Sequence, residues 1–223
     1  MKSTMRSLPG TRSLTIARQR LAFHGSADYW EKNYRLGQTS GSGSYGELAR
    51  GKADFLNEFT RKRELKTVTE FGCGDGNQLS LAEYPAYIGL DVSRSAIRIC
   101  RQKFANDLTK SFFLYDGTCH VDHAGIFGAD LVLSLDVIFH LVEDSVFETY
   151  MADVFGAGRR YVVIYATNAK IQGTAPHVRH RNFTPWVEQN FTEWQLVEHV
   201  PGPGTDRIRA DFFVYQRSIK YQS

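Results

Sequence analysis

A run of three glycines with flanking acids is the part of this sequence best suited to hold a ligand. It reads Glu70-Phe-Gly72-Cys-Gly74-Asp-Gly76, follows a predicted strand at Thr67–Phe71 and is expected to open a helix. Glycines let the backbone approach a ligand closely, and the first N–H groups of a helix are free to bind it. The dinucleotide fingerprint has its last glycine at the sixth position, where this chain has Asn77, so the spacing argues against a nicotinamide enzyme.

Acidic residues follow the next two predicted strands. Asp91 ends the strand at 87–91, and Asp116 follows the strand at 111–115. A carboxylate about 20 residues beyond a glycine loop accepts hydrogen bonds from ribose hydroxyls in nucleotide-binding folds. The alternatives are that Asp91 only caps the following helix, although Ser93 is already a suitable cap, and that Asp116 and Gly117 form a simple turn.

Together these features resemble the class I methyltransferases that use S-adenosylmethionine, whose first motif is acidic-x-G-x-G-x-G. The resemblance extends over residues 67–165. It implies that the glycines pack against the methionine part of the cofactor, that Glu70 helps to hold its amino group, and that Asp91 and Asp116 contact the ribose and the adenine. The cofactor-binding residues implied in this way are Glu70, Gly72, Cys73, Gly74, Gly76, Asn77, Asp91, Val92, Asp116, Gly117 and Leu135.

The segments after the fourth and fifth predicted strands supply the candidates for catalysis, because ligands of open α/β sheets bind beyond the carboxyl ends of the strands. The segment 134–140 also resembles the family's fourth motif, which lines the space between the methyl group and the acceptor. A hydroxyl group that attacks the methyl group must lose a proton, and a histidine with its ordinary pKa of about 6.5 is a suitable base. The catalytic candidates are His180, His140, Asp136 and His177.

His180 is the first choice for the base, because it lies between two arginines that can hold an anionic or polyhydroxylated acceptor. The alternatives are a solvated basic loop at 177–181 and, for His140, a residue at a helix start packed under the sheet. The substrate-binding candidates are Arg179, Arg181, Tyr45 and Asn168.

Asp136 and Asn168 also match two places at which some methyltransferases of catechols and sugars hold magnesium. Thr167 stands where that pattern has another acid, and magnesium prefers carboxylates, so we expect no metal. His120, Asp122 and His123 make a ligand-like group that we interpret as a polar connection. The expected cofactor is therefore S-adenosylmethionine alone, with S-adenosylhomocysteine as the product.

The expected acceptor is a small molecule, and the polar loop rich in histidine and arginine favours a saccharide hydroxyl. The N/D-P-P-Y/F motif of amino-methylating DNA enzymes is replaced by Asp136-Val-Ile-Phe139, and none of the three cysteines lies near this point to methylate a cytosine carbon. The alternatives are a non-sugar metabolite, such as a natural product or a phenol, and a domain that binds S-adenosylmethionine without catalysis.

The net charge of +3 is concentrated at the N-terminus. Residues 1–27 carry five positive charges and no acid, which leaves −2 on the rest of the chain. Because nucleic-acid binders present clusters of lysine and arginine, we expect no nucleic-acid partner. Three cysteines without C-x-x-C spacing favour a cytoplasmic protein, and no apolar run approaches the ~20 residues that cross a membrane. A homodimer is left open.

Strands alternate with helices from residue 67 onward, which predicts an α/β fold with a doubly wound, mostly parallel, Rossmann-like sheet. Strands at 194–200 and 211–215 around the turn at 201–204 predict an antiparallel edge. Residues 28–66 are expected to form a helical cap with a mobile lid loop at 39–46, rich in glycine and serine. The expected organisation is thus a basic arm at 1–27 and a methyltransferase domain at 28–223.

Overall fold

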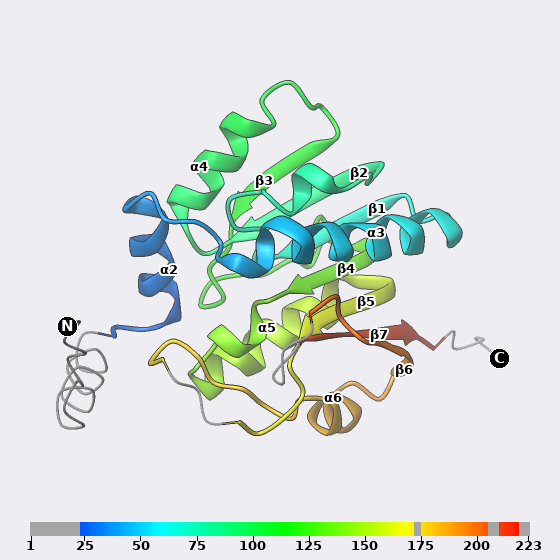
Figure 1. The fold of residues 1–223 in the computed structure, drawn as a ribbon. Coiled ribbons are helices and arrows are strands. Elements are labelled where there is room, and N and C mark those ends of the chain that lie inside the picture. The colour runs from blue at the N-terminus through cyan, green and yellow to red at the C-terminus, as the bar shows by residue number, and fades with distance from the viewer. Residues whose placement is uncertain (1–22, 172–174, 205–209, 219–223) are drawn as a thin grey trace, which may run out of the picture.

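The computed structural model describes residues 23–171, 175–204 and 210–218, and it contains a seven-stranded sheet with helices on both faces (Figure 1). The strands are β1 (Thr67–Phe71), β2 (Ala86–Asp91), β3 (Lys110–Leu114), β4 (Ala129–Leu135), β5 (Gly158–Ala166), β6 (Trp194–Val200) and β7 (Asp211–Arg217). The α-helices are α2 (Ser26–Arg35), α3 (Gly46–Lys62), α4 (Arg94–Lys103), α5 (Asp144–Ala157) and α6 (Thr184–Asn190). Short 3-10 helices are η1 (Ser42–Ser44), η2 (Leu79–Leu81) and η3 (Ile138–His140).

The strand order is β3-β2-β1-β4-β5-β7-β6, which confirms the expected fold class. β1 to β5 are parallel, and β7 pairs antiparallel with both β5 and β6. The central strands β4 and β5 are buried along most of their length, as expected for apolar strands covered on both faces. All the parallel strands therefore end at one edge of the sheet.

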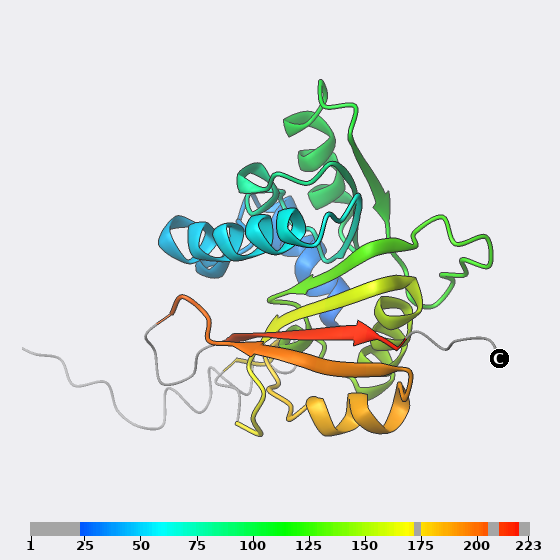
Figure 2. The same ribbon diagram turned by 90° about the vertical axis from the view of Figure 1, so that its right-hand side faces the viewer.

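Helices lie on both faces of the sheet (Figure 2), and an apolar layer is buried on each face. Leu56 and Phe59 of α3 and Cys100 of α4 belong to one layer. Met151 of α5 and Val187 of α6 belong to the other. Burial of such side chains contributes roughly 1.5–3 kcal/mol each, so the layers hold the strand ends in a fixed arrangement.

Helix α2 lies at the carboxyl ends of the parallel strands and is fastened at two points (Figure 1). At its start the hydroxyl of Ser26 donates to Glu143 at 2.7 Å. One turn later the carboxylate of Glu31 accepts the hydroxyl of Ser93 at 2.7 Å and the N–H of Ser95 at 3.1 Å, at the start of α4. The expected helical cap is thus a helix that bridges β4–α5 and β2–α4.

The structure corrects one local expectation. The glycine loop opens no α-helix: residues 77–81 form a turn and η2, because the segment before β2 is too short for a helix and a return. The loop at 39–46, expected to be a mobile lid, contains η1 and is hydrogen-bonded to the glycine loop. At the start of α6 the hydroxyl of Thr184 accepts a hydrogen bond from Asn168.

The expected basic arm lies mostly outside the described residues, and its last two positions, 26 and 27, belong to α2. Within the part of the chain that the structure describes, no helix is long and apolar enough to cross a membrane.

Candidate active site

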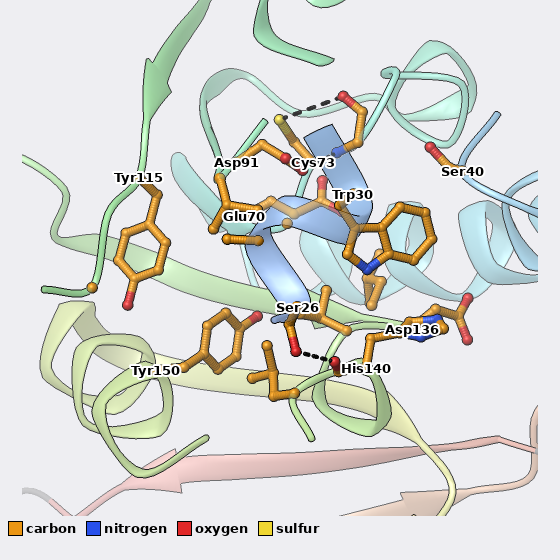
Figure 3. Close-up of a pocket in the computed structure, with 18 of the residues that line it drawn as sticks. Ser26, Trp30, Ser40, Glu70, Cys73, Asp91, Tyr115, Asp136, His140 and Tyr150 are labelled. Carbon is orange, nitrogen blue, oxygen red and sulfur yellow. Dashed lines mark hydrogen bonds between the residues drawn. The ribbon is translucent and has the colours of Figure 1, made fainter. Parts of the chain in front are cut away.

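A cavity of about 590 Å³ opens at the carboxyl ends of β1, β2 and β4. Its walls come from α2, the glycine loop, α3, the segments after β2, β3 and β4, and α5. Figure 3 shows Tyr115 at one end of this cavity and Asp136 at the other, with Glu70 and Asp91 between them. Nine of the eleven cofactor candidates line it: Glu70, Gly72, Cys73, Gly74, Asp91, Val92, Asp116, Gly117 and Leu135. Gly76 and Asn77 lie just behind the wall.

The glycine loop follows a path that only glycine tolerates well. Gly72 has φ 82° and Gly74 has φ 56°, in the left-handed region. A Cβ added at Gly72 would lie 2.4 Å from the side chain of Val137, and one at Gly74 would lie 2.4 Å from the hydroxyl oxygen of Ser40. The missing side chains therefore allow the segment after β4 and the loop at 39–46 to approach the backbone.

Two buried carboxylates stand at the centre of the cavity wall. Glu70 accepts the phenol of Tyr87 at 2.6 Å, and burial raises the pKa of Glu70 to about 7. Asp91 accepts the N–H of Gly74 at 2.9 Å and that of Ser93 at 2.8 Å, and burial raises its pKa to about 6. A positive charge in the cavity would offset the cost of burying these carboxylates.

Asp116, at the far end of the cavity, forms a turn and also lines the cavity. Its carboxylate accepts the N–H and the hydroxyl of Thr118 at 2.9 and 2.7 Å, which is the turn that its Asp-Gly sequence allows. The residue also lines the cavity and is exposed. The turn thus presents Asp116 at the cavity rim and does not remove it from the site.

The loop at 39–46 is tied to the glycine loop through Asp75 and Asn77. One oxygen of Asp75 accepts the N–H of Ser40 at 3.0 Å and the phenol of Tyr45 at 2.8 Å. The amide of Asn77 donates to the carbonyl of Ser44 at 2.7 Å. Tyr45 and Asn77 therefore hold the loop over the cavity mouth from outside the cavity wall.

Asp136 forms an ion pair that the sequence did not suggest. The ammonium of Lys52 in α3 lies 2.6 Å from Oδ2 of Asp136, and Lys52 is only 1% exposed. Lys52 also lies over the ring of Tyr165, 5.1 Å from its centroid. One signal was available: Lys52 is one turn from Leu48 and Leu56, on the apolar stripe of the helix. A lysine on such a stripe must be paired when the stripe is buried.

His140 is the histidine that lines the cavity. Its Nδ1 lies 3.0 Å from the carbonyl oxygen of His177, and because a carbonyl only accepts, Nδ1 carries the proton and Nε2 is unprotonated. The indole of Trp30 meets the His140 ring edge-on, with 4.9 Å between the centroids. Burial lowers the pKa of His140 to about 4, so the ring is neutral near pH 7. His177 stacks on Tyr29 at 4.0 Å, behind this wall.

His180 and the residues around it face a second cavity, of about 320 Å³, between α5 and α6. Nδ1 of His180 lies 2.6 Å from the hydroxyl of Thr167. Arg179 and Arg181 bind Asp144 at 3.0 and 3.1 Å and also the carbonyl oxygens at 141–142, so they brace the segment between η3 and α5. The first choice for the base and its two arginines therefore lie away from the cavity that holds the glycine loop.

The side chain of Asn168 binds the backbone at the start of α6. Its side-chain oxygen accepts the N–H of Phe183 at 2.8 Å and that of Thr184 at 3.3 Å. With Asn168 used in this way and Asp136 paired to Lys52, the two positions considered for magnesium are both engaged. Among the described residues no three His, Cys, Asp or Glu side chains gather in a way that would hold a metal ion.

Comparison with known proteins identifies the fold. No protein-family model matches the chain. The solved methyltransferase domain of bacterial CtHen1-CN has a TM-score of 0.62 at 18% identity, covering 76% of this chain and 100% of that one. The N-methyltransferase NodS from Bradyrhizobium japonicum, solved with S-adenosylhomocysteine, has a TM-score of 0.67 at 15% identity, covering 88% of this chain and 100% of that one. The chain has the class I S-adenosylmethionine-dependent methyltransferase fold.

A relative in sequence is the small RNA 2'-O-methyltransferase of mouse, 25% identical over 67% of this chain. The enzyme of the same name from Arabidopsis thaliana is 24% identical over 66% of the chain. This chain spans 42% of the mouse protein and 19% of the plant protein, so it is similar to part of each.

These relatives overturn the expectation of no nucleic-acid partner, because their names state an RNA substrate. The expectation relied on net charge, which sums over the whole surface and hides local clusters. Helix α4 has four basic residues and no acid in its sequence, and the four are exposed: Arg94, Arg98, Arg101 and Lys103.

Proposed function

We propose that this chain is a methyltransferase that uses S-adenosylmethionine. The observation that carries the proposal is the excess of carboxylates at the cavity wall, where five acids face two basic side chains: Glu70, Asp75, Asp91, Asp116 and Asp136 against Lys52 and Arg94. Such a cavity suits a positively charged ligand. Gln78 supports the same fit, because its side-chain oxygen is buried at this wall without a hydrogen-bond partner among the described residues.

Different residues of the cavity can bind different parts of the cofactor. Glu70 and the unpaired oxygen of Gln78 are suited to an ammonium group. Asp91 is suited to ribose hydroxyls, and Asp116 at the rim to the adenine amino group. This assignment leaves the end of the cavity around Asp136 and His140 for the reacting groups.

The chain's own part in the reaction is to orient the acceptor and to accept its proton. When bound, S-adenosylmethionine supplies an electrophilic methyl group whose C–S bond breaks as the acceptor oxygen forms the new C–O bond, and the sulfur keeps the electron pair. The unprotonated Nε2 of His140 is the proton acceptor that we propose, in place of His180, because His140 lines the cavity. Trp30 offers the adjacent aromatic face to a sugar ring.

The acceptor that we propose is a sugar hydroxyl, and the names of the curated relatives favour the ribose of RNA as the sugar to test first. The exposed basic residues of α4 support this choice, because phosphate groups bind such clusters. A small saccharide or another small metabolite is the second candidate.

The test measures transfer of label from methyl-labelled S-adenosylmethionine to a short single-stranded RNA, to DNA of the same sequence, and to a set of monosaccharides. Label in RNA but not in DNA would support a ribose 2'-hydroxyl, which DNA lacks. Label in the monosaccharides alone would identify free sugars as the acceptor. Binding of S-adenosylhomocysteine without transfer to any acceptor would leave a binding domain.

The proposed base is tested in the same assay with two matched variants. His140→Ala is expected to lower the rate of transfer by about 10²-fold or more, the range for loss of general base catalysis. His180→Ala should leave most of the activity, because its ring faces the second cavity. The reverse order of effects would return the role to His180.

A further inference from the structure

The ion pair between Lys52 and Asp136 lies at the end of the cavity that we assign to the reacting groups. Its charges can therefore affect how the cavity binds the positively charged sulfonium. Lys52 is 1% exposed and lies 2.6 Å from Oδ2 of Asp136. Burying an ammonium group is costly unless it is paired, so a buried lysine on an apolar helix face needs a compensating role. The side chain of Asp136 is 21% exposed and that of Lys52 is 1% exposed, and both residues line the cavity.

Asp136 is held in place by several neighbours. It has φ 60°, which is unfavourable for a residue with a side chain, and its N–H donates to the carbonyl of Tyr165 at 2.9 Å. A Cβ at Gly43 would lie 2.9 Å from Oδ2 of Asp136, so the loop at 39–46 packs directly against the carboxylate. Such strain persists where the surroundings over-determine a conformation, and it is common at functional sites.

The order of the strands fixes where this pair lies relative to the other acids. Along the sheet the carboxylates after β3, at β2 and at β1 come in the order Asp116, Asp91, Glu70, and Asp136 after β4 is next. If the first three hold the adenine, ribose and amino group, the sulfur and its methyl group lie toward Asp136. Lys52 also acts on Glu70, since its charge opposes the rise in the pKa of that carboxyl caused by burial.

We propose that Lys52 is an electrostatic positioning residue, which neutralises Asp136 so that the cavity does not hold the positively charged reactant too strongly. This inference rests on the proposed function. As the methyl group is transferred, the sulfonium becomes a neutral sulfide. The hydroxyl proton then carries the positive charge to His140. A bare carboxylate beside the sulfur would stabilise the reactant more than the transition state, and only interactions stronger in the transition state accelerate a reaction.

The experiment compares the affinities of S-adenosylmethionine, which carries the sulfonium, and S-adenosylhomocysteine, which carries a neutral sulfur, by calorimetry on the full chain. Lys52→Met should raise the affinity ratio in favour of the sulfonium by about tenfold or more, the size expected for one charge within roughly 12 Å at an effective dielectric constant near 20. Asp136→Asn should lower the ratio by a similar factor. The ratio needs no acceptor, so it is measurable whatever the acceptor proves to be.

Two further variants distinguish a change in charge from a loss of folding. The double variant Lys52→Met with Asp136→Asn leaves no unpaired charge behind, and its ratio should return to within about twofold of the parent's value, since the two charges cancel. Lys62→Met removes an exposed lysine of the same helix, paired to Glu58, and should leave the ratio unchanged. Melting temperatures of all variants separate unfolding from a change in charge.

The outcomes separate this inference from the proposed function. Opposite shifts in the two single variants, with recovery in the double variant, support it, and a lower kcat of Lys52→Met at unchanged acceptor KM would extend it to catalysis. Folded variants whose ratio stays at the parent's value, or shifts in the same direction, overturn the role of Lys52 alone. A parent chain that binds neither ligand overturns both.

Discussion

The phenol of Tyr45 donates a hydrogen bond of 2.8 Å to the carboxylate of Asp75, and the N–H of Ser40 donates to the same oxygen at 3.0 Å. One carboxylate of the glycine loop therefore holds two points of the loop at 39–46 over the cavity. A segment rich in glycine and serine loses much conformational entropy when it is ordered. These hydrogen bonds offset that cost, and the cavity mouth depends on them.

Tyr45→Phe should loosen this loop and weaken the binding of ligand beneath it. The substitution removes one hydrogen bond to a carboxylate, a contribution of about 1–2 kcal/mol. We expect faster hydrogen exchange at 39–46 and a roughly five- to thirtyfold weaker affinity for S-adenosylhomocysteine, the factor to which this energy corresponds. Tyr161→Phe, on β5, is the control. Unchanged exchange in Tyr45→Phe would show that the loop is held by other contacts.

The part of the stability of the ligand-free chain that comes from Glu70 and Asp91 should fall as the pH rises from about 4 to 7. Burial raises the pKa of Glu70 to about 7 and that of Asp91 to about 6, above their ordinary values of 4.5 and 3.8. The folded chain therefore keeps protons that the unfolded chain has released, and this stabilisation is lost as the pH passes through the folded-state pKa values. Urea denaturation at pH 5 and pH 8 measures the loss.

Glu70→Gln is the matched variant for this pH dependence. It removes one of the two titrating groups, so its loss of stability between pH 5 and 8 should be smaller than the parent's by roughly 1–3 kcal/mol, since one pKa unit corresponds to about 1.4 kcal/mol. Equal slopes for parent and variant would mean that Glu70 titrates normally in the folded chain.

Asp91→Asn should weaken the binding of S-adenosylhomocysteine and also lower the melting temperature. The carboxylate accepts two backbone N–H groups, one on each oxygen, and the amide keeps only one of these two acceptors. A lost hydrogen bond to a charged group costs about 1–3 kcal/mol, which calorimetry detects directly. Asp107→Asn, an exposed acid after α4, serves as the control. Equal affinities of parent and variant would count against the ribose assignment.

Asn168→Ala should affect stability and leave ligand binding unchanged. The side-chain oxygen accepts two N–H groups at the start of α6, and loss of such a cap costs about 0.5–2 kcal/mol. Thermal denaturation measures this loss, and titration with S-adenosylhomocysteine supplies the comparison. A variant with unchanged stability but a raised KM for the acceptor would restore Asn168 as a substrate-binding residue.

The pattern of neighbouring residues was enough to predict the sheet and most of the residues at the strand ends that line the cavity. Alternation of apolar strands with helices led to the parallel order of β1 to β5, and the spacing of Gly72 and Gly74 after Glu70 identified the loop that lines the cavity. Ser93 was correctly predicted as a cap, since its side chain accepts the N–H of Ala96 at 3.1 Å. These features are local, so adjacent residues determine them.

The end of the cavity around Asp136 and His140 was predicted less well because it is assembled from distant segments. His140 and His180 are alike in sequence, and only the packing of α2 and α6 decides which of them reaches the cavity. Net charge likewise could not reveal the exposed basic residues of α4, because acids elsewhere in the chain cancel them.

The sequence by itself determined the positions of the strands, the glycine loop and the acids at the strand ends, since periodicity and turn residues specify these within short windows. Only the tertiary structure decided that Lys52 meets Asp136, that Asp75 holds Tyr45 and that the arginines at 179 and 181 brace a helix start. Each of these pairs joins residues on different elements. Their meeting depends on how the elements pack, which no local pattern encodes.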